Sequence, residues 1–264
     1  MAGMVNADAA RDRADAGKPP VAGLVLAAGA GSRFGQPKAL VRGADGVPWL
    51  VRTVGVLRAA GCAPVIVVLG AEGAAAAELL AEAGLTEAVS PTFAGPVYAN
   101  TTAVHQTAVH PIDTEPADPE FADSGPAGLS PTERTTVVAY ADDWAEGLSA
   151  SLRRGLKAAL GVFGDPVAVV VVPVDVPDLD AATVTRVLDA DGGVTGDSLR
   201  QAVFGGRPGH PVLIGRAHWE PLRTQLTGDT GARPYLRAHD VLPVECGDLT
   251  TGADVDTRPG VPEA

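Results

Sequence analysis

The chain has 264 residues, long enough for one large domain or for one domain with a tail and an insertion. Hydrophobic residues make up 46% of the sequence, enough for a sizeable core, and the formal net charge is −12. This acidic balance argues against nucleic acid or an anionic membrane as the main partner, because both are bound by basic surfaces. A small phosphorylated ligand stays compatible with it, since a local pair of cations can bind phosphate within an acidic protein.

Targeting and redox features predict a soluble cytoplasmic protein. The first residues include acids and no apolar stretch of signal-peptide length, and no apolar run approaches the ~20 residues of a membrane helix. Cys62 and Cys246 lie far apart and in no metal-like spacing, so we expect two reduced structural thiols rather than a disulfide.

Residues 1–19 are small and charged and end in Lys-Pro-Pro, the composition of a disordered segment. We expect a domain over residues 20–258. In its first part, apolar runs alternate with helical periodicity, which predicts a strand, a helix, a strand and a helix at 21–28, 47–61, 63–70 and 71–84. Residues 91–135 hold many Pro, Thr, Asp and Glu, so a partly disordered surface insertion is expected there.

The alternation resumes after the insertion. It predicts a strand, a helix that begins near Gly147, a strand, a helix, a hairpin-like strand pair, two short helices and a strand at 135–144, 145–161, 165–179, 180–190, 200–215, 217–226, 228–240 and 241–246. This order indicates an α/β protein: a single-domain, three-layer α/β/α, Rossmann-like fold whose mostly parallel sheet is covered on both faces. Ligands of such sheets bind beyond the carboxyl ends of the strands, where GAGSRFGQPK and VDVP are expected.

The stretch LAAGAGSRFGQPK places three glycines, a serine and two cations after the first strand. A dinucleotide-binding fingerprint needs a helix that runs out of the loop, which Pro37 opposes. A P-loop needs Gly-Lys-Ser/Thr, whereas Lys38 stands between Pro37 and Ala39. A plain turn between strand and helix would require neither Arg33 nor Lys38.

A loop that wraps a nucleoside triphosphate accounts for these residues best. Glycines let backbone N–H groups approach phosphate oxygens. Arg33 can grip the β- and γ-phosphates with its planar fork, and Lys38 can neutralise the α-phosphate as it becomes five-coordinate. Lysine is also rare: among 20 cationic residues, the lysines are Lys18, Lys38 and Lys157, so one placed directly after this loop is less readily incidental.

The stretch resembles the nucleotidyltransferase signature L-A-A-G-x-G-x-R-x-G-x-P-K. The chain is most similar to the MobA-like NTP transferases and, within them, to the molybdenum cofactor cytidylyltransferases. The likeness continues in order over most of residues 21–257, through DDWAEGLSASLRRGL, PVDVPDL, GHPVLIG, LTGDTGAR and DVDT. The first motif marks the wider superfamily, and GHPV together with GDTGAR narrows it.

The resemblance implies a nucleotidyltransferase fold and a magnesium-dependent reaction. A phosphate oxygen of an acceptor would attack the α-phosphorus of an NTP in line, and pyrophosphate would leave. Lys38, Arg33 and Asp175 would be catalytic, and Asp175 and Asp256 would hold Mg²⁺, with Asp254 as the alternative second ligand. Implied nucleotide contacts are Leu26, Ala27, Ala28, Gly29, Gly31, Arg33, Lys38, Gly147, Ser149 and Ser151.

Some roles stay open from the residues alone. His210 would contact the substrate or order its own loop. The helix start at Gly147, Ser149 and Ser151 could face the base and ribose or simply cap the helix. For Asp229 a helix cap is favoured over a substrate contact.

The implied substrates are CTP and a phosphorylated acceptor such as molybdopterin, whose product could pass to a molybdoenzyme. CTP is favoured because guanylyl-transferring relatives tend to carry Gly at the position of Ala28, whose Cβ would crowd a purine. Two departures are Ala141, where the subgroup often has Asn, and the missing Pro-Glu-Asp after Thr257. The alternatives are another NTP transferase, such as one acting on sugar phosphates, and a non-catalytic carrier of nucleotide or pterin.

Overall fold

The computed structural model describes residues 18–86 and 135–256. The predicted N-terminal segment up to residue 17 and the predicted insertion, apart from residue 135, lie outside the described residues, as do residues 257 and 258 of the expected domain. In the described ranges, seven strands form one sheet in the order β3-β2-β1-β4-β6-β5-β7. Every pairing is parallel except the two made by β6, which runs antiparallel to β4 and β5.

The strands and helices follow the predicted order. The strands are β1 (Val21–Ala27), β2 (Val65–Leu69), β3 (Thr136–Tyr140), β4 (Ala168–Pro173), β5 (Leu199–Phe204), β6 (Arg207–Gly215) and β7 (Leu242–Glu245). The helices are α2 (Trp49–Ala59), α3 (Gly73–Glu82), α4 (Leu148–Ala159), α5 (Ala181–Asp189), α6 (Trp219–Gln225) and α7 (Arg233–Ala238), and a 3-10 turn, η1, spans Lys38–Leu40. The predicted α/β fold with a mostly parallel sheet is therefore confirmed.

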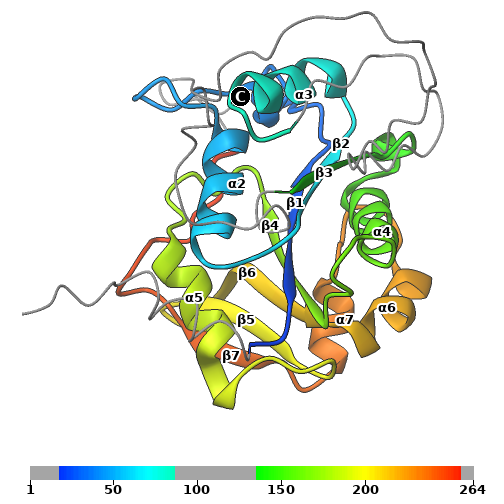
Figure 1. Ribbon diagram of the computed structural model, residues 1–264, viewed down its shortest axis with the longest axis vertical. Helices are drawn as coiled ribbons and strands as arrows, with labels where there is room; N and C mark the ends of the chain where they lie inside the picture. Colours follow the sequence, from blue (N-terminus) through cyan, green and yellow to red (C-terminus); the bar gives the residue numbers. More distant parts are fainter. Residues whose placement is uncertain (1–17, 87–134, 257–264) are drawn as a thin grey trace, which may run out of the picture.

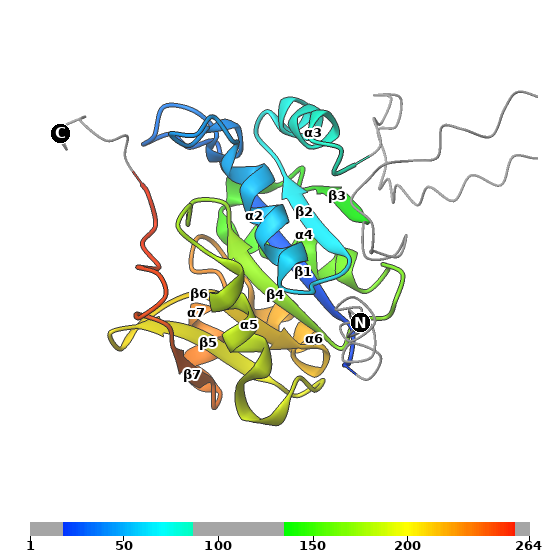
Figure 2. The ribbon, with the colours of Figure 1, turned by 60° about the vertical axis from the view of Figure 1, so that its left-hand side comes forward.

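The sheet separates two hydrophobic cores. Leu50 and Leu57 of α2 and Val184 of α5 pack on one face, together with apolar residues of α3. Leu156 of α4 and Trp219 of α6 pack on the other face, together with residues of α7. Figures 1 and 2 show α2 and α5 on one side of the sheet and α4, α6 and α7 on the other. Three layers result, as the sequence predicted.

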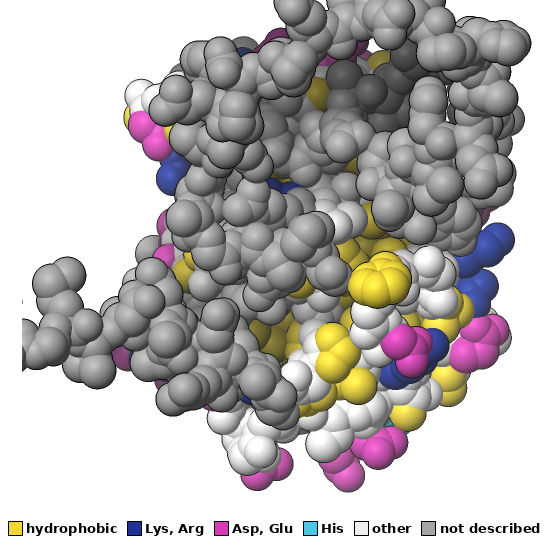
Figure 3. Space-filling model, in the orientation of Figure 1, with side chains coloured by type: hydrophobic (Ala, Val, Ile, Leu, Met, Phe, Trp, Pro, Cys, Tyr) yellow, Lys and Arg dark blue, Asp and Glu magenta, His cyan; other side chains and the backbone are white. Residues whose placement is uncertain are grey.

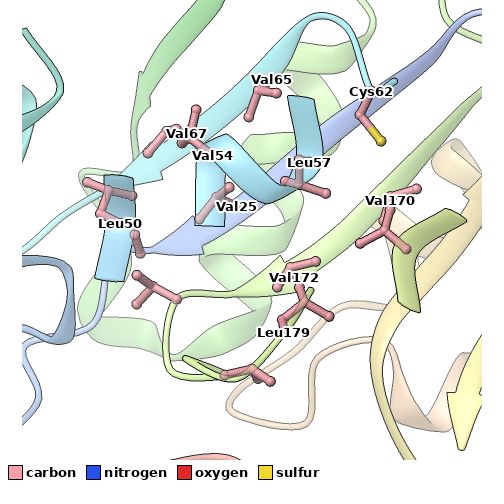
Figure 4. Packing of buried hydrophobic residues seen from close by; sticks show 14 of the residues in the cluster. Val25, Leu50, Val54, Leu57, Cys62, Val65, Val67, Val170, Val172 and Leu179 are labelled. Carbon is pink, nitrogen blue, oxygen red and sulfur yellow. The ribbon is translucent and has the colours of Figure 1, made fainter. Parts of the chain in front are cut away.

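Continuous apolar sequence explains why β1 and β4 lie at the centre. All seven residues of β1 are buried, and so are the first five of β4. A strand that is covered by helices on both faces has no solvent side, so polar alternation is lost. Figure 4 shows side chains of α2, such as Leu50 and Leu57, pointing onto Val25 of β1 and its neighbours in the sheet.

Strands are added to the sheet first on one side of β1 and then on the other. β2 pairs with one edge of β1, and β3 continues on that side, whereas β4 pairs with the opposite edge of β1. The loops after β1 and β4 therefore leave the carboxyl ends of two neighbouring strands, and both lead to helices on the same face, α2 and α5. Open α/β sheets bind ligands at such a switch point.

The surface and the cysteines agree with the composition. In the part of Figure 3 that shows described residues, acidic and basic side chains are interspersed with exposed hydrophobic ones around α6 and α7. Cys62 and Cys246 are both buried and unpaired, and burial raises the pKa of the Cys62 thiol to about 12. No helix within residues 18–86 and 135–256 has both the length and the apolarity needed to cross a membrane.

Two helical glycines give a matched test of this packing. A Cβ on Gly155 of α4 would lie 2.5 Å from Leu24 Cδ1 of β1, whereas a Cβ on Gly55 of α2 would meet nothing within 4 Å. We expect Gly155→Ala to lower the free energy of unfolding by about 1–3 kcal/mol through overpacking. Gly55→Ala should raise it by about 0.5–1 kcal/mol because alanine favours the helix. Urea unfolding of the two variants checks this, and equal effects would contradict the close approach of α4 to β1.

Candidate active site

The glycine-rich loop folds back on itself directly after β1. The Gly31 carbonyl oxygen accepts hydrogen bonds from the amides of Phe34, at 2.9 Å, and Gly35, at 2.8 Å. Gly31 has a φ of +60°, and a Cβ there would lie 1.9 Å from the Gln36 carbonyl oxygen, so only glycine fits. Phe34 is buried against Trp49 with its ring edge on, which anchors the loop in the core.

This anchoring fixes what the loop presents. Pro37 is buried, and the next residue, Lys38, opens the 3-10 turn η1. Helix α2 begins only at Trp49, so no helix starts at the loop as a dinucleotide fingerprint requires. The loop instead carries two cations, an exposed Arg33 and a largely buried Lys38, to the carboxyl end of β1.

Lys38 joins three segments that are distant in the sequence. Its Nζ donates to Asp175 Oδ2 at 2.7 Å and to Asp256 Oδ1 at 2.8 Å, although 137 and 218 residues separate the partners. Asp175 follows β4, and Asp256 lies at the end of the closing segment, residues 250–256, which follows β7. The sequence therefore placed the two acids at one edge of the sheet correctly, and the structure adds that they share one lysine.

The hydrogen bonds of Lys38 shift its own pKa and that of Asp256. Burial alone would lower the pKa of Lys38, but hydrogen bonds to Asp175 and Asp256 outweigh it and raise that pKa above its usual value. The hydrogen bond from Lys38, and then its charge, lower the pKa of Asp256, with a smaller contribution from Arg33. The raised pKa of Lys38 and the lowered pKa of Asp256 both favour the charged pair. The two acids therefore do not simply repel each other in the absence of a ligand, because Lys38 bonds both of them.

A third carboxylate lies beside this cluster. Burial, followed by the charges of Asp175 and Asp256, raises the pKa of Asp254, while Lys38 and Arg233 partly offset this. Within the described residues no group donates a hydrogen bond to the Asp254 side chain. The site therefore holds three acids around one directly bonded cation, and negative charge is in excess.

The site fits a divalent cation of the kind that the resemblance implies. Asp175 Oδ1 is buried and has no hydrogen-bond partner, so an acceptor oxygen is left over beside Lys38. In residues 18–86 and 135–256 no three His, Cys, Asp or Glu side chains are placed to hold a metal ion together. Magnesium does not need such a trio, because it binds through one or two carboxylates and completes its shell with phosphate and water.

His210 of β6 faces the same region from the neighbouring strand. Burial lowers its pKa, while a hydrogen bond to the Val171 backbone and the charge of Asp175 act in the opposite direction. Its Nδ1 is buried without a partner. A neutral imidazole with one free nitrogen thus lies near Asp175, and its role as a substrate contact stays a prediction.

The start of α4 is capped from within the protein. Asp229 Oδ1 accepts from the Leu148 amide at 3.1 Å, and the Gly228 carbonyl oxygen accepts from the Ser149 amide at 3.0 Å. Asp229 is therefore a helix cap, as favoured. A Cβ on Gly147 would lie 2.3 Å from Asp229 Oδ1, which explains the glycine. The amides of Leu148 and Ser149 already donate to protein oxygens, so in this geometry they are not open to the nucleotide contact predicted for this helix start.

The other residues predicted to bind nucleotide differ in their exposure to solvent. Gly29 is exposed beside the loop, whereas the hydroxyl-bearing Ser149 and Ser151 are buried and Ser149 Oγ has no partner. Three residues at the end of β1 are also buried: Leu26, Ala27 and Ala28. These three residues are therefore largely covered by protein in the described structure.

Sequence reasoning missed two features of the site. Arg233, the first residue of α7, is exposed and its charge acts on both His210 and Asp254. Its position in LTGDTGAR was the available signal. The anchor provided by Phe34 was missed because a lone aromatic within a glycine-rich stretch has no periodic pattern.

Asp254 and Asp256 should respond oppositely to neutralisation. An acid with a raised folded-state pKa costs stability above that pKa and nothing below its unfolded value of about 3.9. Asp254→Asn should therefore raise the melting temperature of the ligand-free protein at pH 7, and the gain should vanish as the pH falls below about 4. Asp256→Asn should lower it at pH 7, because Lys38 loses a partner. Melting curves at pH 4–7 check both, and a lower melting temperature for Asp254→Asn at pH 7 would contradict the excess of negative charge.

Comparison with known proteins is consistent with this arrangement. Over 256 residues the chain is 28% identical to the protein named nicotine blue oxidoreductase from Paenarthrobacter nicotinovorans, covering 92% of this chain and 95% of that protein. A nucleotidyl transferase from Methanothermobacter thermautotrophicus shares the fold, with a TM-score of 0.59 at 19% identity, covering 90% and 92% of the two chains. A homologue of the Mycobacterium tuberculosis protein Rv0371c from Mycobacterium sp. strain JC1 has a TM-score of 0.57 at 23% identity, covering 90% of each chain.

A protein-family model also matches most of the chain. It covers residues 23–118 and 122–242, which contain the glycine-rich loop, Asp175 and His210, and most of the segment predicted to be an insertion. Asp254 and Asp256 lie beyond its end. The chain belongs to the family with a MobA-like NTP transferase domain.

Proposed function

We propose that this protein is an enzyme that transfers a nucleoside monophosphate from an NTP to a phosphorylated small molecule and releases pyrophosphate. The observation that carries the proposal is the convergence of Lys38, Asp175 and Asp256 at the switch point of the sheet, beside a loop that only glycine at position 31 allows. Membership of the NTP transferase family supports the same reaction class.

The chain's own side chains would act by position and charge. In-line attack at the α-phosphorus needs little covalent help from a protein, but it needs the two substrates aligned and the developing charge neutralised. In the ligand-free structure two carboxylates hold Lys38 at the carboxyl end of β1, so its ammonium already lies beside the loop that would bind the phosphates. Arg33 is exposed at the tip of the loop, where its fork can reach the outer phosphates.

Asp175 and Asp256 would hold the divalent cation that such reactions use. A magnesium ion bound by them would supply positive charge to the phosphate oxygens. A manganese-bound structure of Rv0371c, with 22% identity and a TM-score of 0.52, exists for a protein of the same fold. The choice of Mg²⁺ for this chain belongs to the proposal.

CTP is the proposed nucleotide, and molybdopterin is the proposed acceptor. The support for CTP is Ala28, which is 2% exposed at the end of β1 and whose carbonyl oxygen accepts from the Ala71 amide at 3.0 Å. This side chain is fixed in place, so its Cβ cannot move aside for a larger base. The support for the acceptor is the resemblance of GHPV and GDTGAR, and a molybdoenzyme would be the receiver of the product.

The name of the Paenarthrobacter relative raises redox chemistry as the alternative. A dinucleotide site at this loop would need a helix that starts there, and α2 starts at Trp49 instead. The two cysteines are buried and apart, so they offer no dithiol pair. Both observations favour nucleotidyl transfer, and the experiment below includes a reduced dinucleotide for this reason.

The test is a thermal-shift screen with Mg²⁺ and each of CTP, GTP, ATP, UTP and NADPH, followed by pyrophosphate release with molybdopterin. A ligand raises the melting temperature as its concentration exceeds its dissociation constant. We expect the largest shift with CTP. A larger shift with GTP would overturn the nucleobase assignment, and a shift with NADPH alone would overturn nucleotidyl transfer.

Lys38→Ala should lower turnover by about 100-fold or more, because its charge is needed mainly in the transition state. Lys157→Ala is the control, since Lys157 is exposed on the last turn of α4, and it should keep normal turnover. Steady-state pyrophosphate release measures both. Near-normal turnover of Lys38→Ala would refute the proposed role of the loop.

A further inference from the structure

The closing segment, residues 250–256, has no helix or strand, yet it must place Asp256 against Lys38. It is held by contacts to two other parts of the chain. Gly252 has a φ of +61°, and a Cβ there would lie 2.2 Å from the Phe204 ring, so the segment lies flat against that ring. The Val255 amide donates to the Asp175 carbonyl oxygen at 2.9 Å. Backbone of the closing segment is thus bonded directly to the residue that follows β4.

One carboxylate forms a further anchor at the other end of the segment. Asp178 Oδ2 accepts from the Thr251 amide at 2.9 Å and from the Thr251 Oγ1 hydroxyl at 2.5 Å. Thr251 Oγ1 in turn accepts from the Ala253 amide at 3.2 Å. Two hydrogen bonds to one carboxylate oxygen, 73 residues away in the sequence, fix both the backbone and the side chain of Thr251.

Asp178 is free to bond Thr251 because it does not cap helix α5. The N-cap of α5 is Asp180, whose Oδ1 accepts from the Thr183 amide at 2.8 Å. With Asp180 as the cap, the exposed Asp178 serves only contacts to the closing segment in the described structure.

We propose that Asp178 and Thr251 are positioning residues, which clamp the closing segment so that Asp256 reaches Lys38 beside Asp175. Each end of the clamp lies close in sequence to a carboxylate that bonds Lys38: Asp178 is three residues from Asp175, and Thr251 is five residues from Asp256. Without the clamp, Val255 and Asp256 would be held only by the hydrogen bond from the Val255 amide to Asp175 and by the bond from Lys38 to Asp256. The distance between the Asp175 and Asp256 carboxylates would then no longer be fixed.

The variants separate the clamp from general surface charge. Asp178→Ala removes the acceptor, whereas Asp178→Asn keeps an amide oxygen that can still accept from Thr251. Thr251→Val removes the hydroxyl at nearly constant shape, and Thr251→Ser restores it. Asp248→Ala is the matched control, because Asp248 is an exposed acid of the same C-terminal region that bonds Arg186 and not the closing segment.

The first measurement does not depend on any activity. Amide hydrogen exchange of residues 251–256 in the ligand-free protein should be about fivefold or more faster in Asp178→Ala and Thr251→Val, since local opening becomes easier. Asp178→Asn, Thr251→Ser and Asp248→Ala should stay near the wild-type rate. The double variant Asp178→Ala/Thr251→Val should increase the exchange rate by less than the product of the two single increases, because both variants remove the hydrogen bond from the Thr251 hydroxyl to Asp178. Unchanged exchange in Asp178→Ala would overturn the clamp.

The second measurement rests on the proposed function. With CTP present, the Mn²⁺ dissociation constant should rise by about tenfold in Asp178→Ala, as is usual when a residue that orients a ligand is lost. Saturating Mn²⁺ should restore most of the turnover. Faster exchange with unchanged Mn²⁺ affinity would overturn the positioning role. A wild-type protein that binds neither CTP nor Mn²⁺ would contradict the proposed function instead, and exchange alone would then decide the clamp.

Discussion

The two ion pairs of Lys38 are the interactions on which the candidate site depends. Lys38 Nζ lies 2.7 Å from Asp175 and 2.8 Å from Asp256, and the lysine side chain is only 14% exposed. A largely buried ammonium is costly unless it is paired, and two carboxylates close together are costly unless a cation lies between them. Each member of the cluster therefore makes the others tolerable. The same balance leaves the cluster ready for a cation of higher charge, because Asp254 and the free oxygen of Asp175 add negative charge that Lys38 does not satisfy.

The fold serves to bring these groups together. The pairing of β1 with β4 makes the loops after these two strands neighbours, the buried Phe34 ties the glycine-rich loop to the core, and the turn after β4 supplies Asp175. The closing segment is the least regular part, and it is fixed by contacts to Asp178, Phe204 and the Asp175 backbone. The family match ends at residue 242, before this segment. Asp256 therefore lies beyond the matched residues, but the contacts that hold its segment are made by residues inside the match.

Most of the fold followed from the sequence because its signals are local. The apolar runs of β1 and β4 predict buried strands, and Pro48 and Gly61 bracket α2. Long-range pairings had no such signal. The antiparallel insertion of β6 between β4 and β5, and the capping of α4 by Asp229, depend on residues that meet only in three dimensions.

The site shows the same division between local and distant information. Lys38 and Asp175 could be found because each follows a strand and stands in a motif. That they share a salt bridge could not be found, because a lysine after a glycine-rich loop predicts a phosphate ligand and gives no sign of a carboxylate partner. Asp254 was ambiguous for a related reason, since Asp-Val-Asp places two acids on one side of an extended segment and only the tertiary structure shows which one meets Lys38.

The central claim is that Lys38 occupies the place of a cation between Asp175 and Asp256. The direct measurement is a Mn²⁺ titration of the nucleotide-free protein, followed by electron paramagnetic resonance, for the wild type and Lys38→Met. If the ammonium and the metal compete for the same oxygens, the Mn²⁺ dissociation constant of the variant should be at least about tenfold lower than that of the wild type. Removing the lysine charge from this partly buried site should favour Mn²⁺ binding by at least about 1.4 kcal/mol, which corresponds to that tenfold change. Equal or weaker Mn²⁺ binding by Lys38→Met would contradict the account.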